Sequence, residues 1–343
     1  MTRTLMYTEA SAAPDCLQRQ LERLPEPLGP LIRHLCTRPL RLVITCGRGS
    51  SDHAGVFIRY LIETGRHIPT ASATPSTLSI YQAGTRLEDT LVILISQSGQ
   101  SPDLVHYARM ARAAGASTLG LINRVEDAAL TPYCDFILPL HAGPEQAVAA
   151  TKSWLAALFA GLMLVAAWAD DPQLQAALVQ LPEQMRQAQT LDWSAAHGVL
   201  DQARHLLVLG RGPGLGVASE IALKFKETCA LHAEAFSAAE VLHGPLAMIR
   251  PGFPVLVFDQ GDGSRPGIQQ TIARLQQAGA RVMLASTEAV PGCLMLPVLP
   301  GLLPWCALLT QAQSAYLMIE QQARHRGSNP DAPANIRKVT ETL

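Results

Sequence analysis

Short runs of β-branched residues and leucine recur along this chain, bounded by glycine, proline or polar residues and separated by longer segments with helical periodicity. This alternation is typical of a doubly wound α/β fold, in which helices connect parallel strands. The predicted strands of the first half comprise residues 41–45, 90–95, 117–122 and 135–138. Those of the second half comprise residues 205–209, 254–258, 280–285 and 293–298.

The two sets of strands are related by a nearly constant spacing. Three of the four pairs are offset by about 163 residues and the last by slightly less, which indicates a diverged internal duplication. With 343 residues the chain is long enough for two such domains. We therefore expect a helical N-terminal segment (1–40), a first domain (41–180), a second domain (181–326) and a C-terminal tail (327–343).

The charges of the chain are nearly balanced, with 27 basic and 28 acidic residues and a formal net charge of -1. No overall field therefore favours nucleic acid or an anionic membrane, and an anionic ligand must be held by a local site. The longest apolar run, residues 154–168, is shorter than the roughly 20 residues that a membrane-spanning helix needs, so we interpret it as a buried helix. The acidic residues near the N-terminus argue against an export signal.

The cysteines are odd in number, scattered and never spaced as CxxC. They are residues 16, 36, 46, 134, 229, 293 and 306. This distribution argues against a disulfide framework and against a zinc site, and it fits the reducing cytoplasm. We expect a cytoplasmic protein that uses neither a metal nor another cofactor.

A polar loop directly follows the second predicted strand and precedes a predicted helix. Its residues are Ser96, Gln97, Ser98, Gly99 and Ser101. Hydroxyls and backbone N–H groups at the carboxyl end of a strand, beside a helix N-terminus, hold phosphate in open α/β sheets without a metal. A serine cluster that only caps the helix is the alternative, because serine is favoured at that position. The combination of three serines with a glutamine and a glycine favours phosphate.

A second glycine-rich loop, CGRGSSDHAG at residues 46–55, follows the first predicted strand. Its glycines allow a ligand to approach the backbone closely, and Ser50 and Ser51 would add donors to the same anion. The run lacks the GxGxxG spacing of a dinucleotide-binding loop. The corresponding residues 259–262 of the second half include two aspartates that would repel phosphate, so we expect one phosphate site per chain.

Glu220, Lys224 and Glu227 are spaced i, i+4 and i+7, which places them on one face of a predicted helix. A solvated helix face with weak ion pairs is one interpretation of this spacing. The helix, however, follows the strand and glycine loop LVLGRGPG and leads towards His243, so a reactive site is the other interpretation. His243, next to a Gly-Pro turn, could by itself be structural.

The chemistry of an aldose–ketose conversion requires a base that moves a proton between C1 and C2 and a group that opens the sugar ring, which a Glu and a His can supply. If the substrate carries an amine, a lysine is useful because its Schiff base makes the neighbouring C–H more acidic. The candidate lysines are Lys152, Lys224, Lys226 and Lys338.

These runs together resemble the sugar-isomerase (SIS) superfamily, and within it the isomerase half of glucosamine-6-phosphate synthase and the stand-alone glucosamine-6-phosphate deaminases. The matching runs are CGRGSSDHAG, SQSGQSPD, AGPEQAVAATKSW, LGRGPGLGVASEIALKFKETCALHAEAFSAAEVLHGPLAMI and PANIRKVTE. The resemblance implies two tandem SIS domains, each a doubly wound parallel sheet flanked by helices in a flavodoxin-like or Rossmann-like three-layer sandwich.

The resemblance also implies roles for individual residues. Glu227 matches the carboxylate that transfers the proton between C1 and C2, and His243 matches the ring-opening histidine that is reached across a dimer interface. Lys338 matches the tail lysine that forms a Schiff base with the open keto sugar, and Lys224 matches a helper lysine of that site. The implied contacts to the phosphate and the sugar are Ser51, Ser96, Gln97, Ser98 and Ser101, together with backbone groups of Val148 and Ala150. A tail that carries a catalytic lysine is expected to close over the substrate.

Three features depart from the synthase pattern. The chain begins Met1-Thr2-Arg3 and not with the nucleophilic cysteine of a glutaminase domain, so glutamine hydrolysis is not expected. Ala150 stands where the synthase has a serine, which leaves the exact sugar specificity open. The N-terminal run LMYTEASAAPDCLQRQL is more similar to the stand-alone deaminases than to the synthase.

We therefore expect an enzyme that converts glucosamine 6-phosphate to fructose 6-phosphate and ammonia, as a homodimer with a shared active site and without nucleic-acid or membrane partners. A deglycase or isomerase of a fructosamine 6-phosphate or of galactosamine 6-phosphate is an alternative, because the same groups would serve. The alternative from a different class is a non-catalytic phosphosugar sensor, although no helix-turn-helix extension or basic patch is visible.

Overall fold

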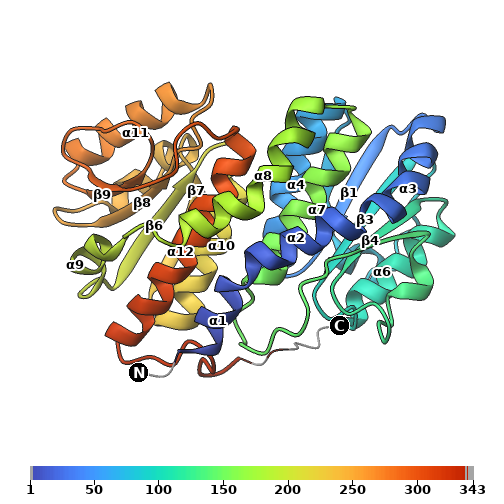
Figure 1. Cartoon of the computed structure of the whole chain (residues 1–343), viewed down its shortest axis with the longest axis horizontal. Helices are drawn as coiled ribbons and strands as arrows, with labels where there is room; N and C mark the ends of the chain where they lie inside the picture. Colours follow the sequence, from blue (N-terminus) through green and yellow to red (C-terminus); the bar gives the residue numbers. More distant parts are fainter. Residues whose placement is uncertain (1–2, 337, 339–343) are drawn as a thin grey trace. The chain divides into compact units, whose positions relative to one another are not determined.

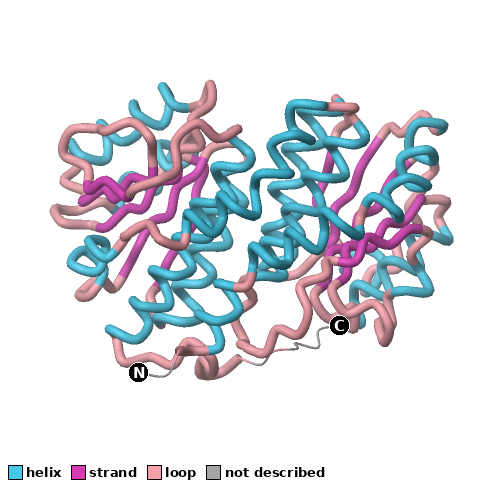
Figure 2. The backbone as a smooth tube through the Cα atoms, viewed as in Figure 1, coloured by secondary structure: helices cyan, strands magenta, loops and turns pink. Residues whose placement is uncertain are grey.

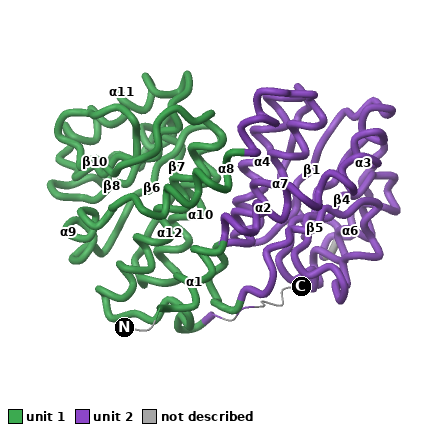
Figure 3. The backbone as a smooth tube through the Cα atoms, in the orientation of Figure 1, with its two compact units in different colours: residues 1–12, 146–151, 180–335 green, residues 13–145, 152–179, 336–343 purple. Residues whose placement is uncertain are grey.

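The computed structural model describes residues 3–336 and 338 and contains two compact units. Unit 1 comprises residues 1–12, 146–151 and 180–335, and unit 2 comprises residues 13–145, 152–179 and 336–343 (Figure 3). Each unit has strands covered by helices (Figures 1 and 2). Residues 3–12 belong to unit 1 and residues 13–40 to unit 2, so the predicted N-terminal helical segment is divided between the units.

The sheet of unit 2 has five parallel strands in the order β2-β1-β3-β4-β5. The strands are β1 (Leu42–Cys46), β2 (Thr70–Ser72), β3 (Thr90–Ser96), β4 (Ser117–Ile122) and β5 (Phe136–Pro139). All seven residues of β3 are buried, as expected for a central strand with helices on both faces. The strand order reverses direction between β1 and β3.

The sheet of unit 1 repeats this topology, with the order β10-β9-β8-β6-β7 and all strands parallel. The strands are β6 (His205–Gly210), β7 (His232–Ser237), β8 (Pro254–Phe258), β9 (Arg281–Ala285) and β10 (Leu294–Leu296). Relative to the first strand of each sheet, the order of neighbours is the same in both units. The internal duplication predicted from the strand spacing is confirmed at the level of topology.

The sheet of unit 2 is sandwiched between two helical layers. One layer consists of α2 (Ala13–Arg23), α3 (Pro25–Thr37), α4 (Ser50–Arg66) and α7 (Lys152–Trp168), and the other of α5 (Pro75–Ser79) and α6 (Pro102–Ala113). Alternate residues of β3 serve the two faces: Val92 and Leu94 join the core under α6. This alternation follows from the period of two along a strand.

The sheet of unit 1 is covered in a similar way. Helices α10 (Gly214–Cys229) and α12 (Pro304–His325) pack together beside β6, and α1 (Leu5–Ser11) packs on α12. On the other face, α11 (Arg265–Gln277) and the short turns η3 (Glu240–His243) and η4 (Pro245–Met248) cover a second apolar cluster. The remaining short elements are η1 (Thr131–Tyr133), η2 (Ser194–Ala196) and α9 (His197–Leu200). Helix α8 (Pro172–Ala188) connects the units along the chain.

The predicted strands are all present, with ends that differ by a few residues. The sequence pattern does not reveal β2 and β7, which are the edge strands beside β1 and β6. β2 has three residues, and β7 reads HAEAFS without a β-branched residue, so neither carries the usual strand signal. The apolar run 154–168 forms α7, which is buried as predicted, and no helix among the described residues is long and apolar enough to span a membrane.

Candidate active site

The carboxyl ends of β1 and β3 in unit 2 form the point where the strand order of the sheet reverses. In open α/β sheets the loops on either side of such a point diverge and leave a crevice, which is where ligands bind. The loop after β1 leads into α4 at Ser50, and the loop after β3 leads into α6 at Pro102. Both loops singled out in the first half of the sequence therefore leave the sheet at its topological switch point, where a ligand is expected.

The loop after β3 is held in a defined shape by its own side chains. Ser96 Oγ accepts a hydrogen bond from the backbone N–H of Gly99 at 2.9 Å, and Ser98 Oγ accepts one from that of Gln100 at 3.2 Å. Gly99 has φ +65°, and a Cβ there would lie 2.4 Å from the Cβ of Ala128. Only glycine fits this position without displacing its neighbours.

The hydroxyl groups of this loop are not engaged in capping α6. Ser101 is the N-cap residue of α6, but its side chain makes no capping hydrogen bond in the described structure. A hydroxyl has one donor and two acceptor positions, so Ser96 and Ser98 can still donate an O–H to a ligand while they accept from the loop backbone. The arrangement leaves hydroxyl donors beside the positive end of α6, which supports anion binding.

The loop after β1 turns into α4 at very close range. A Cβ on Gly47 would lie 2.6 Å from the backbone carbon of Ser51, so the chain can enter α4 this tightly only with glycine. Ser50 and Ser51 begin α4, as the predicted anion site requires. Arg48 lies between them and β1, and its Nε donates to Oδ2 of Asp103 at 2.5 Å.

The loop after β8 in unit 1, which corresponds to the loop after β3 in unit 2, is built differently. Asp259 follows β8 and forms an ion pair with Arg265, whose Nε lies 2.7 Å from Oδ2. Arg265 also pairs with Glu288, and Asp262 accepts hydrogen bonds from Ser264. Asp259 and Arg265 border a polar cavity of about 140 Å³. The three carboxylates against one guanidinium give this loop a negative balance, which opposes a phosphate.

The acidic and basic residues of α10 lie on one helix face, as their spacing predicts, but the solvated-surface interpretation is wrong. The side chains of Glu220 and Lys224 are 0% and 1% exposed, whereas that of Glu227 is 20% exposed. Lys224 Nζ lies 3.4 Å from Oε1 of Glu220 and donates to Oε2 of Glu227. Lys226 is exposed, away from this cluster.

Helix α12 completes the cluster. Tyr316, itself fully buried, donates from its hydroxyl to Oε1 of Glu220 at 3.1 Å. Burial lowers the pKa of Lys224, but the charges of Glu220 and Glu227 and their hydrogen bonds outweigh burial, so its pKa is raised above the ordinary 10.5. Lys224 therefore remains an ammonium at neutral pH and holds the side chain of Glu227 in place through their hydrogen bond.

Lys338 lies in unit 2, beside a buried carboxylate. Its Nζ is 3.4 Å from Oε2 of Glu145, whose side chain is 0% exposed. Glu145 also accepts hydrogen bonds from the N–H of Ser153 at 3.1 Å and from its hydroxyl at 2.5 Å. The Lys338 side chain is 24% exposed, so it is paired with a buried carboxylate but is not itself fully buried.

The other predicted site residues lie in unit 1. His243 is the last residue of η3 and is exposed. Val148 and Ala150 are half-buried in segment 146–151, where the N–H of Val148 donates to the carbonyl of Asp331 at 3.3 Å. Glu9 accepts hydrogen bonds from the backbone of Gln146 and Ala147, which fastens this segment to unit 1.

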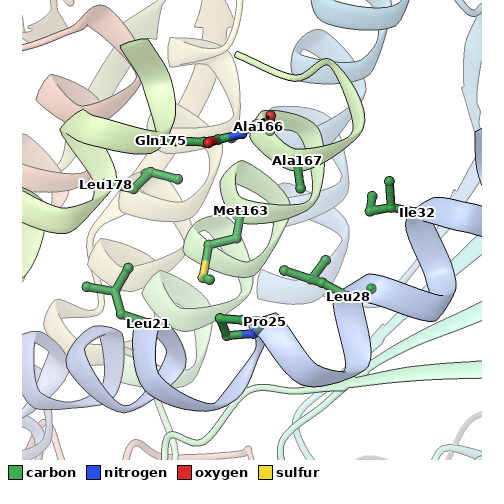
Figure 4. A pocket seen from close by; sticks show the side chains of 10 residues that line it. Leu21, Pro25, Leu28, Ile32, Met163, Ala166, Ala167, Gln175 and Leu178 are labelled. Atoms are coloured by element: carbon green, nitrogen blue, oxygen red, sulfur yellow. Dashed lines mark hydrogen bonds between the residues drawn. The ribbon is translucent and has the colours of Figure 1, made fainter. Parts of the chain in front are cut away.

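An apolar cavity of about 440 Å³ lies in unit 2 among α2, α3, α7 and α8. Figure 4 shows Leu21, Leu28 and Met163 around it. The residues that line it include no acid, base or nucleophile, so it offers no groups for catalysis.

Sequence reasoning missed three residues, of which two contact candidate site residues and the third contacts Arg48 in the loop after β1. Glu145 lies within the run AGPEQAVAATKSW, where its local partner is Ser153, but its contact with Lys338 joins positions 193 residues apart. Tyr316 lies 96 residues from Glu220 and reads as part of an ordinary helix. Asp103 lies 55 residues from Arg48 and resembles a first-turn helix acid. Only the fold brings these pairs together.

Comparison with known proteins places this architecture in a family. The SIS-domain family model matches residues 41–167 and 199–289. The isomerising glutamine–fructose-6-phosphate aminotransferase of Gluconobacter oxydans is 31% identical over 98% of this chain and 58% of its own length, and that of Zymomonas mobilis is 30% identical over 86% and 51%. The chain thus spans about half the length of these curated relatives.

Solved structures agree with this assignment. A Silicibacter pomeroyi protein assigned to the phosphosugar isomerases is 38% identical, with a TM-score of 0.91 over 96% of this chain and 100% of that one. The glucosamine-6-phosphate deaminase of Thermotoga maritima, at 20% identity, shares the fold with a TM-score of 0.79 over 99% and 100% of the two chains. The duplicated sheet and both matched segments lead to one conclusion: the chain belongs to the SIS-domain family and is related to the isomerising aminotransferases.

Proposed function

We propose that the protein converts glucosamine 6-phosphate and water to fructose 6-phosphate and ammonia, without a metal or another cofactor. The observation that carries this proposal is the buried Glu220–Lys224–Glu227 cluster, which presents one partly exposed carboxylate on a rigid helix. Burial of three charged groups is costly unless they are paired, so this cluster differs from an ordinary ion pair on a helix surface. The relatives of this chain include enzymes named isomerising glutamine–fructose-6-phosphate aminotransferases.

In the proposed reaction, His243 opens the sugar ring and Glu227 takes the proton from C2. Reprotonation at C1 then gives an imine at C2. This imine exchanges its nitrogen for that of Lys338, which releases ammonia, and water hydrolyses the lysine imine to fructose 6-phosphate. Each proton that leaves C2 is matched by one added at C1, so no oxidant or reductant is needed. We further propose that His243 acts in the partner's active site within a homodimer.

The surroundings of the lysines favour Lys338 as the imine-forming residue. Lys224 is buried between two carboxylates that keep it protonated, and Lys152 is 8% exposed and donates to the carbonyl of Pro144. Lys226 lies outside the cluster on α10. Lys338 is partly open, and the carboxylate of Glu145 would stabilise the positive charge of a protonated imine.

Reductive trapping tests this assignment. The protein would be incubated with fructose 6-phosphate and borohydride, and the modified peptide identified by mass spectrometry. The proposal predicts one reduced sugar adduct, on Lys338, that is absent from Lys338→Ala. An adduct on Lys152, Lys224 or Lys226, or none at all under conditions of turnover, would contradict the role of Lys338.

A further inference from the structure

Arg48 is a charged residue in the loop between β1 and α4, and the sequence pattern assigns no function to it. Arg48 is in the second position after β1, and its Nε donates to Asp103 Oδ2 at 2.5 Å. Asp103 is the second residue of α6, directly after Ser101 and Pro102. The guanidinium is therefore fixed next to the polar loop after β3.

The ion pair is asymmetric in a way that leaves donors available. The side chain of Asp103 is 1% exposed, whereas that of Arg48 is 51% exposed. A guanidinium has five N–H donors, and the contact with Asp103 uses the one on Nε. Among the described residues the structure gives Arg48 no other side-chain partner. The two terminal nitrogens thus form a planar fork that can donate two hydrogen bonds to one oxyanion.

The reason for the buried carboxylate is also apparent. A buried Asp is destabilising unless it is paired and hydrogen-bonded, and Asp103 accepts from Arg48 and from the N–H of Leu104. Because the pairing uses Nε, Asp103 sets the direction of the guanidinium without occupying its fork. Asp52, the acidic residue in the first turn of α4, accepts a hydrogen bond from Ser72 on β2.

The duplicated unit provides an internal comparison. Arg211 follows Gly210 at the end of β6 as Arg48 follows Gly47 after β1, but its Nη1 donates to the hydroxyl of Ser237 at 3.0 Å. In that unit the loop after the central strand contains Asp259, Asp262 and Arg265 in place of the serines. The arginine is thus shared by both units, whereas the combination with hydroxyls and a carboxylate that binds Nε occurs in unit 2.

We propose that Arg48 binds the phosphate of the substrate through its terminal guanidinium nitrogens and that Asp103 is its positioning residue. This inference rests on the proposed phosphosugar function and adds a charged ligand to a site otherwise made of hydroxyls, backbone N–H groups and helix N-termini. Its consequence is selectivity for a phosphorylated over an unphosphorylated sugar, because a bidentate charge-assisted contact is lost when the phosphate is missing.

The test is calorimetric titration of the full-length protein with fructose 6-phosphate and, separately, with inorganic phosphate. Arg48→Ala is expected to weaken the affinity for both by about tenfold to a hundredfold, as loss of charge-assisted hydrogen bonds predicts. Arg48→Lys keeps the charge but not the fork, so it is expected to retain only part of the affinity that Arg48→Ala loses. Arg41→Ala is the matched control, because Arg41 lies just before the opposite end of β1 and is 85% exposed. It is expected to bind like the wild type.

Arg48→Ala could destabilise the protein by leaving Asp103 buried and unpaired. The double variant Arg48→Ala/Asp103→Asn removes both charges, and it is expected to show the same loss of phosphate affinity with a wild-type urea midpoint. Wild-type affinity for phosphate in the folded double variant would overturn the inference. Binding of inorganic phosphate that depends on Arg48, in a protein that neither binds nor converts sugar phosphates, would instead retain the inference and overturn the proposed function.

Discussion

At the scale of single residues, the proposed function rests on the charge cluster on α10. Glu220 and Lys224 are fully buried and Glu227 is partly exposed. Lys224 pairs with both carboxylates, so it connects the buried Glu220 to the partly exposed Glu227. Tyr316 provides a neutral donor to the deepest of the three. A base held by neighbouring groups in this manner is positioned for proton transfer before the substrate arrives.

Glu227→Gln is expected to lower kcat by about a hundredfold to ten-thousandfold, because it removes the proposed proton acceptor while leaving the shape of the side chain. Binding of fructose 6-phosphate is expected to be nearly unchanged. Steady-state kinetics and titration would measure the two effects. Glu183→Gln is the control, since Glu183 is a 62% exposed carboxylate in the same unit. Near-normal turnover of Glu227→Gln would exclude this residue as the base.

Lys224→Met is expected to destabilise the protein by about 3–5 kcal/mol, because it leaves the buried carboxylate of Glu220 without its cation. The double variant Glu220→Gln/Lys224→Met is expected to regain most of this loss, since no buried charge is then uncompensated. Urea unfolding of the two variants and the wild type at neutral pH would measure the differences. Equal stability of Lys224→Met and the wild type would show that the cluster is not coupled in solution.

The same lysine gives a pH dependence whose sign follows from its pKa. The pKa of Lys224 is raised in the folded protein above 10.5, so the stability that its charge contributes is fully present below pH 10.5. This contribution is lost as the pH rises through the folded-state pKa. The difference in unfolding free energy between the wild type and Lys224→Met should therefore stay constant from neutral pH to about pH 10 and shrink above it. A difference that grows with alkaline pH would contradict the assignment.

At the scale of elements, the two units repeat one construction, in which a glycine at the end of the first strand or just after it lets the chain turn directly into a helix. A Cβ on Gly47 would lie 2.6 Å from the backbone of Ser51, and one on Gly210 would lie 2.1 Å from the carbonyl oxygen of Gly214. The two units differ in the loop after the central strand. Serines follow β3 in unit 2, whereas an Asp259–Arg265 ion pair follows β8 in unit 1.

Gly47→Ala and Gly210→Ala separate the shared construction from the specific site. Both are expected to lower stability by about 1–3 kcal/mol, because the added methyl group must displace backbone. Only Gly47→Ala is expected to weaken phosphate binding, since its loop enters the proposed anion site. Urea unfolding and phosphate titration of both variants would test this. Equal weakening by Gly210→Ala would place phosphate binding in both units.

The fold could be predicted from the sequence to the extent that local pattern encodes it. The central strands and the apolar helix α7 follow from runs of β-branched and leucine residues, whereas the edge strands β2 and β7 form through pairing with β1 and β6 and carry little local signal. The α10 cluster was visible as a spacing, but its burial depends on α12, which follows 75 residues after α10 ends. The contact of Glu145 with Lys338 is likewise a product of tertiary structure.

At the scale of the whole molecule, the proposal requires a homodimer in which His243 serves the partner's active site. Hybrid dimers test this directly. Glu227→Gln and His243→Ala should each be inactive, yet after unfolding and joint refolding the mixture should regain about a quarter of wild-type activity, because each hybrid contains one intact site. A mixture that stays inactive, although hybrids are demonstrated by affinity tags, would show that both residues act from the same chain.

The central claim is that the protein releases ammonia from an amino-sugar phosphate, and the most direct measurement is an ammonia assay with purified protein. Glucosamine 6-phosphate, galactosamine 6-phosphate and a fructosamine 6-phosphate would be compared, with Lys338→Ala as the control. The account predicts ammonia and fructose 6-phosphate in equal amounts from glucosamine 6-phosphate, and loss of this activity in the variant. Turnover of only one of the other sugars would contradict the proposed substrate, and binding of all three without turnover would indicate a phosphosugar sensor in place of an enzyme.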